Sequence, residues 1–137
     1  RGYQIRALVE QEKVGRLATV RLSTAREGTQ GVVIDLLMAS SGIEPEITQA
    51  AEELEVFAGL VVPVARMGHL IALKLLARDD RRRPQDRIDL GYLVPLAAEG
   101  DLALAREALS QIEQRGFSRG RDLHKMLDEL LTELRES

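Results

Sequence analysis

The sequence predicts an α+β fold in which a small sheet is followed by a helical lobe. Two segments near the N-terminus alternate apolar and polar residues, which indicates strands, and a near-continuous apolar run at 32–38 indicates a third strand. From Met67 onward, apolar residues recur at helical spacing. We therefore expect a sheet region over residues 1–66 and a helical lobe over residues 67–137.

The composition excludes several classes of protein. A chain of 137 residues buries about two-thirds of its unfolded surface, which is enough for one core. The absence of cysteine excludes disulfides, zinc–thiolate sites, iron–sulfur clusters and cysteine nucleophiles. A net charge of −3 and the scarcity of aromatic residues argue against a protein that coats nucleic acid. No apolar run approaches the ~20 residues of a membrane span.

The first strands are predicted from alternation. Residues 5–9 and 17–22 place apolar side chains at every second position, which is typical of half-buried strands. A hairpin connection at 13–16 joins them, and a second loop follows at 25–31, where two glycines stand among polar residues.

The middle of the chain is less regular. Residues 44–53 predict a short helix, and Pro45 is compatible with its first turn. Residues 54–65 leave two alternatives open, because their valines favour a strand while Gly59 interrupts it. Pro63 would confine any such strand to the edge of a sheet.

The helical lobe begins with an apolar helix over residues 68–78, which ends before a break at 81–84. Pro84 then opens a second helix over about 85–98.

Two further helices are expected. The third follows Gly100, takes Asp101 as its N-cap and ends at Gly116. The fourth carries leucines from 123 to 134 at intervals of three and four residues. That leucine stripe belongs either to the protein's own core, which we favour, or to a surface that docks a partner or a second copy.

Asp35 is the first candidate site residue, because it is the one charged residue in the apolar run 32–38. Such a run suits a strand buried on both faces, where a carboxylate is costly unless it is paired, hydrogen-bonded or metal-bound. One interpretation is a structural aspartate that pairs with an arginine or lies at an open edge. The other is a metal-binding or acid–base carboxylate at the active face of the sheet.

Lys74 and Arg78 are candidates for contacts with an anion. Apolar residues cover nearly the whole circumference of the helix over 68–78, and these two cations lie one turn apart on one side. Like charges at this spacing repel mildly, so the pattern indicates an anion opposite them. The alternative is that both side chains extend along the apolar surface into solvent.

Asp86 and Asp89 lie three residues apart near the start of the second helix, and therefore share a face. Acidic residues at a helix N-terminus are favoured by the helix dipole, which accounts for them structurally. The functional alternative is that they orient Lys74 or Arg83, or contribute to a polar site.

Residues 74–87 form a local cationic segment. They include six cations and three acids in a chain whose net charge is negative. Guanidinium and ammonium groups bind phosphate oxygens, so the segment suits a phosphate-bearing ligand, with a solvated charged loop as the alternative. His69 and His124 lie far apart in the sequence, and we expect neither to bind a metal.

Three segments together resemble a known family. They are VVIDLL at 32–37 with ASSG at 39–42, LIALKLLAR at 70–78, and RPQDRIDL at 83–90. In this order and spacing they resemble the AbiEii-like branch of the nucleotidyltransferase superfamily, which includes toxins of bacterial abortive-infection and toxin–antitoxin systems. The resemblance covers about residues 1–98 and implies a small mixed sheet of the nucleotidyltransferase (polymerase-β-like) type, followed by a C-terminal helical lobe.

The resemblance implies transfer of a nucleotidyl group from a nucleoside triphosphate to an RNA or protein acceptor. Two Mg²⁺ ions held by three carboxylates stabilise the attacking and leaving oxygens in such enzymes. Asp35 matches the third of these carboxylates, so Asp35 is the expected metal ligand, and Asp35 and Lys74 are the expected catalytic residues. The residues expected to bind the nucleotide are Lys74, Arg78, Arg83, Asp86 and Asp89. A cytoplasmic protein with an antitoxin partner and no membrane span is also implied.

The chain departs from the family pattern at one point. The family's first motif places two carboxylates one residue apart before the first strand, and Asp79 and Asp80 are adjacent and follow a helix. We therefore expect this chain to be the C-terminal portion of a nucleotidyltransferase, inactive by itself. The alternative is a degenerate, non-catalytic interaction module.

Overall fold

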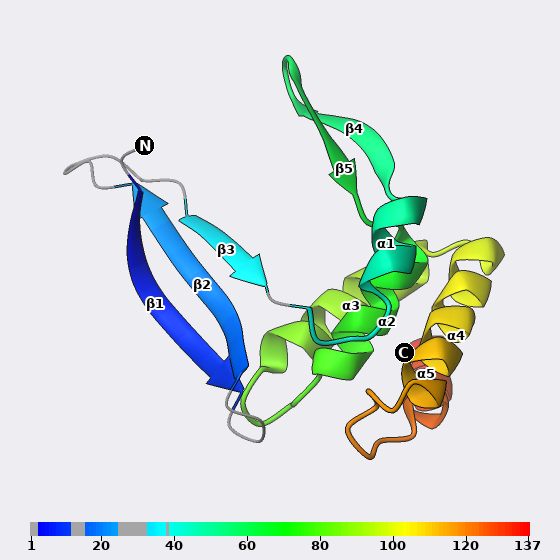
Figure 1. Cartoon of the computed structure of the whole chain (residues 1–137). Coiled ribbons are helices and arrows are strands. Elements are labelled where there is room, and N and C mark those ends of the chain that lie inside the picture. The colour runs from blue at the N-terminus through cyan, green and yellow to red at the C-terminus, as the bar shows by residue number, and fades with distance from the viewer. Residues whose placement is uncertain (1–2, 12–15, 25–32, 38) are drawn as a thin grey trace. The chain divides into compact units, whose positions relative to one another are not determined.

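The structure is a computed structural model that describes residues 3–11, 16–24, 33–37 and 39–137 (Figure 1). Strands come first in the chain and helices dominate its later part, so the predicted α+β class is confirmed. The chain divides into two compact units, Arg1–Ser40 and Ser41–Ser137. The division falls earlier than the predicted boundary between residues 66 and 67.

The first unit is a three-stranded sheet of β1 (Tyr3–Gln11), β2 (Arg16–Thr24) and β3 (Val33–Leu37). Neighbouring strands are antiparallel, in the order β1-β2-β3, so the described sheet is antiparallel where a mixed sheet was expected. The hairpin connection predicted at 13–16 lies outside the described residues except for Arg16, which begins β2, and the loop predicted at 25–31 lies wholly outside them.

The prediction that the apolar run at 32–38 is buried on both faces is wrong. The run does contain a strand, β3, but Val33 and Leu36 are exposed and Ile34 is half-buried. β3 is the edge strand of the described three-stranded sheet, but burial of its two faces depends on layers that cover the sheet. Within the described part of this unit, no second layer of secondary structure covers that strand.

The second unit begins with α1 (Glu44–Ala50), which starts at the predicted residue and ends three residues before the predicted end. The Glu44 carboxylate accepts hydrogen bonds from the Ser41 backbone N–H at 2.7 Å and from the Ser41 hydroxyl at 2.8 Å, which fixes the entry to the helix. Ile43 is fully buried in the core that the later helices form. This burial is the physical reason that the segment belongs to the helical unit.

The ambiguous segment at 54–65 is a β-hairpin. Its strands are β4 (Glu52–Phe57) and β5 (Leu60–Val64), paired antiparallel. Gly59 adopts a positive φ of 79° in the turn, a conformation that favours glycine, and its N–H donates to the Glu55 carboxylate at 2.7 Å. Most side chains of the hairpin are exposed.

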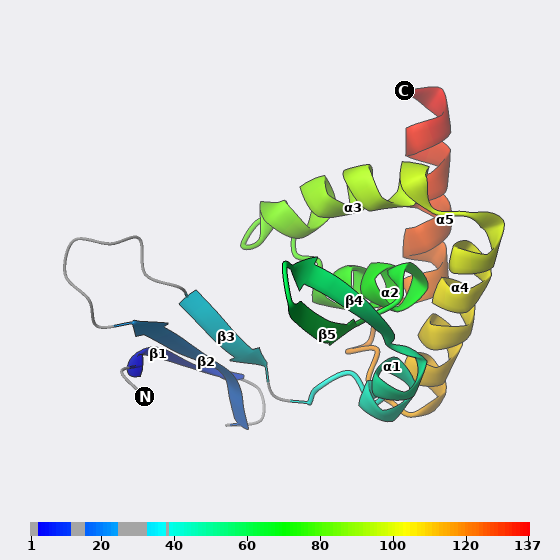
Figure 2. The same ribbon diagram turned by 90° about the horizontal axis from the view of Figure 1, so that it is seen from above.

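Four helices complete the unit, namely α2 (Met67–Ala77), α3 (Pro84–Leu96), α4 (Glu99–Gln114) and α5 (Leu123–Glu136). Figure 2 shows α2 among α3, α4 and α5, and each of these three helices contacts α2. The core contains Ile43, Ile71, Ala72, Leu75, Leu76, Leu90, Val94, Ala105, Ala108, Leu109, Ile112, Leu123, Leu127 and Leu130. The leucine stripe of α5 is thus part of the protein's own core, as we favoured.

The predicted start of α4 is wrong. The helix begins at Glu99, so Gly100 lies inside it and Asp101 is not the N-cap. Instead the Asp101 carboxylate reaches back and accepts the Ala98 backbone N–H at 2.9 Å, which satisfies a donor that the helix leaves free. In the described part of the chain, no helix is both long enough and apolar enough to cross a bilayer.

His69 lies in the first turn of α2 and is only 3% exposed. Its Nδ1 atom is buried and has no hydrogen-bond partner among the described residues. Burial lowers the pKa of His69, because the charged imidazolium is poorly solvated there. The nearby charges have smaller, opposed effects, since Glu107 and Glu46 raise the pKa and Arg66 lowers it.

We expect the protein to lose stability as the pH falls below about 6.5, the ordinary pKa of histidine. The folded state holds His69 neutral, so the unfolded chain binds the proton more readily in that range. The free energy of unfolding should fall by at most about 1.4 kcal/mol per pH unit, measured by urea denaturation between pH 7.5 and pH 5. His69→Leu should flatten this dependence, because it removes the group whose pKa burial lowers. An unchanged slope in His69→Leu would contradict the assignment.

Candidate functional site

The strongest polar cluster joins α2 and α3. The Lys74 ammonium lies 3.2 Å from Oδ1 of Asp86 and 2.5 Å from Oδ2 of Asp89. Both carboxylates accept hydrogen bonds from the same Nζ atom. The structure therefore brings together three of the residues that the sequence singled out, and it agrees with the interpretation in which the two acids orient Lys74.

Local sequence explains this geometry. Pro84 starts α3, so Asp86 and Asp89 lie in its first turns and face the same side. Lys74 lies in the last turn of α2, which packs against α3. The arrangement thus needs only two helices and the short connection between them.

Two further side chains hold the carboxylates in place. The Gln85 amide donates to Oδ1 of Asp89 at 2.7 Å, and Arg83 Nε lies 3.2 Å from Oδ2 of Asp86. The Asp86 side chain is only 4% exposed, so its charge is balanced inside the protein by Lys74 and Arg83. Arg83, which the sequence also singled out, therefore acts here as a partner of Asp86.

Lys74 is a permanent cation at neutral pH. Its hydrogen bond to Asp89 raises the pKa of the ammonium, with Asp86 adding to the effect, and the pKa of Asp89 is lowered by Lys74 and then by Gln85. An ammonium has three donors, and two of them are used by the carboxylates. With 26% of the side chain exposed, the third donor can serve a ligand, but Lys74 is unsuited to act as a general base.

Arg78 does not share an anion with Lys74. Its Nε and Nη2 atoms donate to the two carboxylate oxygens of Asp80 at 2.7 and 2.8 Å, a bidentate pair that lowers the pKa of Asp80. Both Lys74 and Arg78 are mostly covered and ion-paired, so the alternative that they extend freely into solvent is wrong. Each cation instead has its own carboxylate partner.

Two arginines that precede α5 reach the end of α2, which sequence analysis did not predict. Arg121 donates to the Leu76 carbonyl and, at 2.6 Å, to the Arg78 carbonyl, while Arg119 lies 3.5 Å from the Leu76 carbonyl. These groups satisfy carbonyls that a helix leaves unpaired at its C-terminus. No local pattern could have shown these contacts, because the partners lie more than 40 residues apart in the sequence.

The turn between α2 and α3 retains uncompensated positive charge. Arg81 and Arg82 are exposed, and no carboxylate in residues 39–137 lies within ion-pair distance of either side chain. Their backbone N–H groups donate to the Asp79 carboxylate, which shapes the turn. The turn thus adds two exposed cations between Arg78, at the end of α2, and Arg83, at the start of α3.

Asp35 belongs to the first unit and is exposed near the middle of β3. The strand register places it directly opposite Arg21 of β2, on the edge strand of the sheet. This backbone geometry agrees with the interpretation of a structural aspartate at an open edge opposite an arginine.

The described residues do not by themselves fit a magnesium site. Among them there is no group of three acidic or histidine side chains that could hold a metal ion. Asp86 and Asp89 already bind Lys74, and Asp35 supplies a single carboxylate. We therefore derive no step through a metal from these residues.

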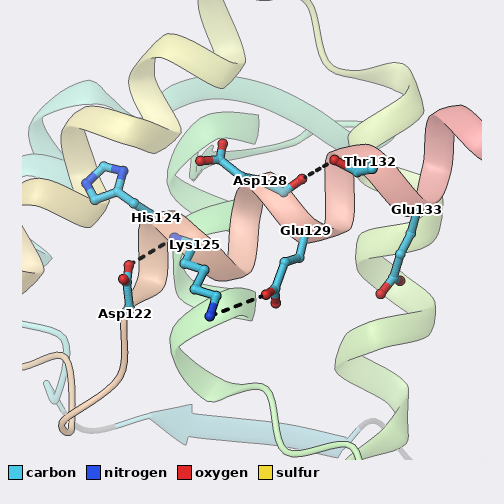
Figure 3. Close-up of a pocket in the computed structure, with 7 residues that line it drawn as sticks. All are labelled: Asp122, His124, Lys125, Asp128, Glu129, Thr132 and Glu133. Carbon is cyan, nitrogen blue, oxygen red and sulfur yellow. Dashed lines mark hydrogen bonds and ion pairs between the residues drawn. The ribbon is translucent and has the colours of Figure 1, made fainter.

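A shallow hollow along α5 is a different surface feature (Figure 3). Its side chains engage one another, as when Lys125 lies 3.8 Å from Glu129 and Asp122 caps the backbone N–H of Lys125. None of the predicted site residues lines it. Its polar groups do not converge on one point in Figure 3, so we do not consider it the functional site.

Comparison with known proteins identifies one family that the chain matches. The model of one protein family, described as nucleotidyl transferase AbiEii toxin of a type IV toxin–antitoxin system, matches residues 4–136. No curated protein matches the chain.

Proposed function

This chain belongs to the AbiEii family of nucleotidyl transferase toxins, and we propose that it takes part in nucleotidyl transfer with Lys74 as the cation that binds the triphosphate. The observation that carries the proposal is the Lys74 ammonium, which two carboxylates fix in position while one of its donors stays available. Arg81 and Arg82 supply further positive charge near this point in the sequence.

The chemistry of the reaction explains why such a cation is needed. An acceptor oxygen forms a bond to the α-phosphorus, the bond to the bridging oxygen breaks, and pyrophosphate leaves with its negative charge. A fixed ammonium near the leaving phosphates stabilises that charge without having to reorganise during the reaction. The raised pKa of Lys74 keeps it in the charged form that this role requires.

The other predicted site residues have different roles in this proposal. Asp86 and Asp89 position Lys74, and Arg83 holds Asp86. Arg78 would contribute its charge to the phosphates from its pair with Asp80. Asp35 is proposed, on the ground of the family match, as one carboxylate of a magnesium site, since the described residues alone contain no group of three metal ligands. The acceptor is an RNA or a protein, and the proposed setting is the bacterial cytoplasm, with an antitoxin as partner.

The proposal is tested by following label from a nucleoside triphosphate. The intact protein is incubated with Mg²⁺ and each of the four triphosphates labelled at the α-phosphate, together with cellular RNA or with cellular protein. We expect Mg²⁺-dependent label in one acceptor, removed by ribonuclease or by protease respectively. Absence of label in both acceptors with all four triphosphates would refute the proposal.

Asp35→Asn is expected to abolish this transfer while the fold remains intact. The change removes the charge that a metal ligand needs, yet keeps the size of an exposed side chain on an edge strand. Glu53→Gln is the matched control, because Glu53 is also an exposed carboxylate on a strand. Equal transfer of label by Asp35→Asn and by the control would contradict a role in metal binding. Asp35 would then be only the cross-strand neighbour of Arg21.

The alternative of a non-catalytic interaction module has lost one of the two features that suggested it, the other being the departure from the family's paired carboxylates. The leucine stripe from 123 to 134 was the candidate docking surface, and Leu123, Leu127 and Leu130 are buried in the core. We therefore retain nucleotidyl transfer as the proposed function.

A further inference from the structure

An exposed apolar stripe runs along α3 beside the Lys74 cluster. Ile88, Tyr92 and Leu96 occupy successive turns, and Tyr92 and Leu96 are 72% and 74% exposed. The opposite side of the same helix is ordinary core, since Leu90 and Val94 are buried. Tyr92 is the aromatic member of this stripe, and its ring therefore offers a flat apolar surface to solvent.

Helix geometry places Tyr92 next to the polar cluster. Tyr92 follows Asp89 by three residues and Gln85 by seven, so all three lie on one face of α3. Three residues correspond to a rise of about 4.5 Å along the axis. Helical side chains also tilt toward the N-terminus of their helix, which leans the ring toward the turn that carries Asp89.

The space around this part of α3 is open. The Tyr92 side chain is exposed to solvent, and so is Leu96 one turn further along the helix. A flat ligand therefore has room beside the ring, and its charged end could extend along the same helix face to the third donor of Lys74.

We infer that Tyr92 is the stacking surface for the nucleobase of the nucleoside triphosphate whose phosphates bind at Lys74. The inference rests on the proposed function, since it assigns a second contact to the same ligand. The physical basis is that an aromatic side chain stacks on the face of any base, and one such contact contributes about 1–3 kcal/mol to binding. Leu96 extends the apolar surface by one further turn.

The test separates the base from the phosphates. Calorimetry on the intact protein measures the dissociation constants of ATP, of GTP and of inorganic tripolyphosphate, which lacks a base. Tyr92→Ala should weaken binding of both nucleotides by about 5- to 100-fold and leave tripolyphosphate binding unchanged. Tyr92→Phe should bind like the original protein, because the ring is kept.

Phe57→Ala is the matched control, because it removes an aromatic ring that is as exposed as Tyr92 but lies on another element, the strand β4. Unchanged nucleotide affinity in Tyr92→Ala would overturn the inference. An equal loss for tripolyphosphate would also overturn it, because the substitution would then have disturbed the phosphate site. If the original protein bound neither nucleotide nor tripolyphosphate, the proposed function itself would fail.

Discussion

Lys74→Ala is expected to reduce nucleoside triphosphate binding and nucleotidyl transfer by on the order of 100-fold, the effect of losing one fixed charged donor to the reacting phosphates. The substitution removes a cation whose position depends on two carboxylates and leaves the negative charges of Asp86 and Asp89 beside the ligand. Calorimetry with a nucleoside triphosphate and the α-phosphate label assay measure the two quantities.

The control for Lys74→Ala is Arg87→Ala. Arg87 also lies on a helix and forms an ion pair, with Glu133 at 2.8 Å, but it has no contact with the cluster. Both variants lower the net charge by one unit, so general electrostatic effects cancel in the comparison. Lys74→Met, which keeps the packing of the aliphatic stem, should lose binding in the same way even if the alanine variant is less stable. Equal binding by Lys74→Met and Arg87→Ala would remove Lys74 from the site.

Gly68→Ala is expected to lower the free energy of unfolding by about 1–3 kcal/mol, the usual cost of forcing an extra methyl group into a packed core. Gly68 lies where α2 meets α4, and an added Cβ would be 2.5 Å from the Asp101 carbonyl oxygen and 2.8 Å from Cβ of Leu104. A backbone carbonyl inside a helix cannot yield without moving the helix. Urea denaturation followed by circular dichroism measures the change.

Gly100→Ala provides a comparison with the same chemical change. Gly100 also lies in a helix, but a Cβ there would meet nothing within 4 Å. Alanine favours the helical conformation over glycine by about 0.5–1 kcal/mol, so this variant should be more stable than the original protein. A similar effect of both substitutions would show that the close packing of α2 on α4 is not what makes Gly68 necessary.

Sequence patterns predicted the helices and site residues whose positions depend on neighbours within a few residues. The helix expected over 68–78 is α2, because its apolar residues and its ends depend on neighbours within a few positions. Helical spacing alone predicted that Asp86 and Asp89 lie on one face of α3. Their interaction with Lys74 required only that two helices joined by a short connection pack together.

Features that depend on distant partners were not predicted. The apolar run at 32–38 has the composition of a buried strand, yet Val33 and Leu36 are exposed because the described part of this unit contains no second layer that covers the sheet. The capping of α2 by Arg119 and Arg121 joins segments that only the fold brings together. Asp101 was placed at the wrong position of α4, because an acid at the third helical residue and one at the N-cap produce similar sequence patterns.

The hairpin of β4 and β5 has consequences for how the protein avoids self-association. Two-stranded sheets have two open edges, and apolar side chains as exposed as Phe57 would invite another copy to add a strand. Glutamates at three positions of β4 repel an identical strand, and Pro63 leaves β5 with one backbone donor fewer. The composition of this hairpin thus protects it against growth into an aggregate while its apolar surface stays accessible.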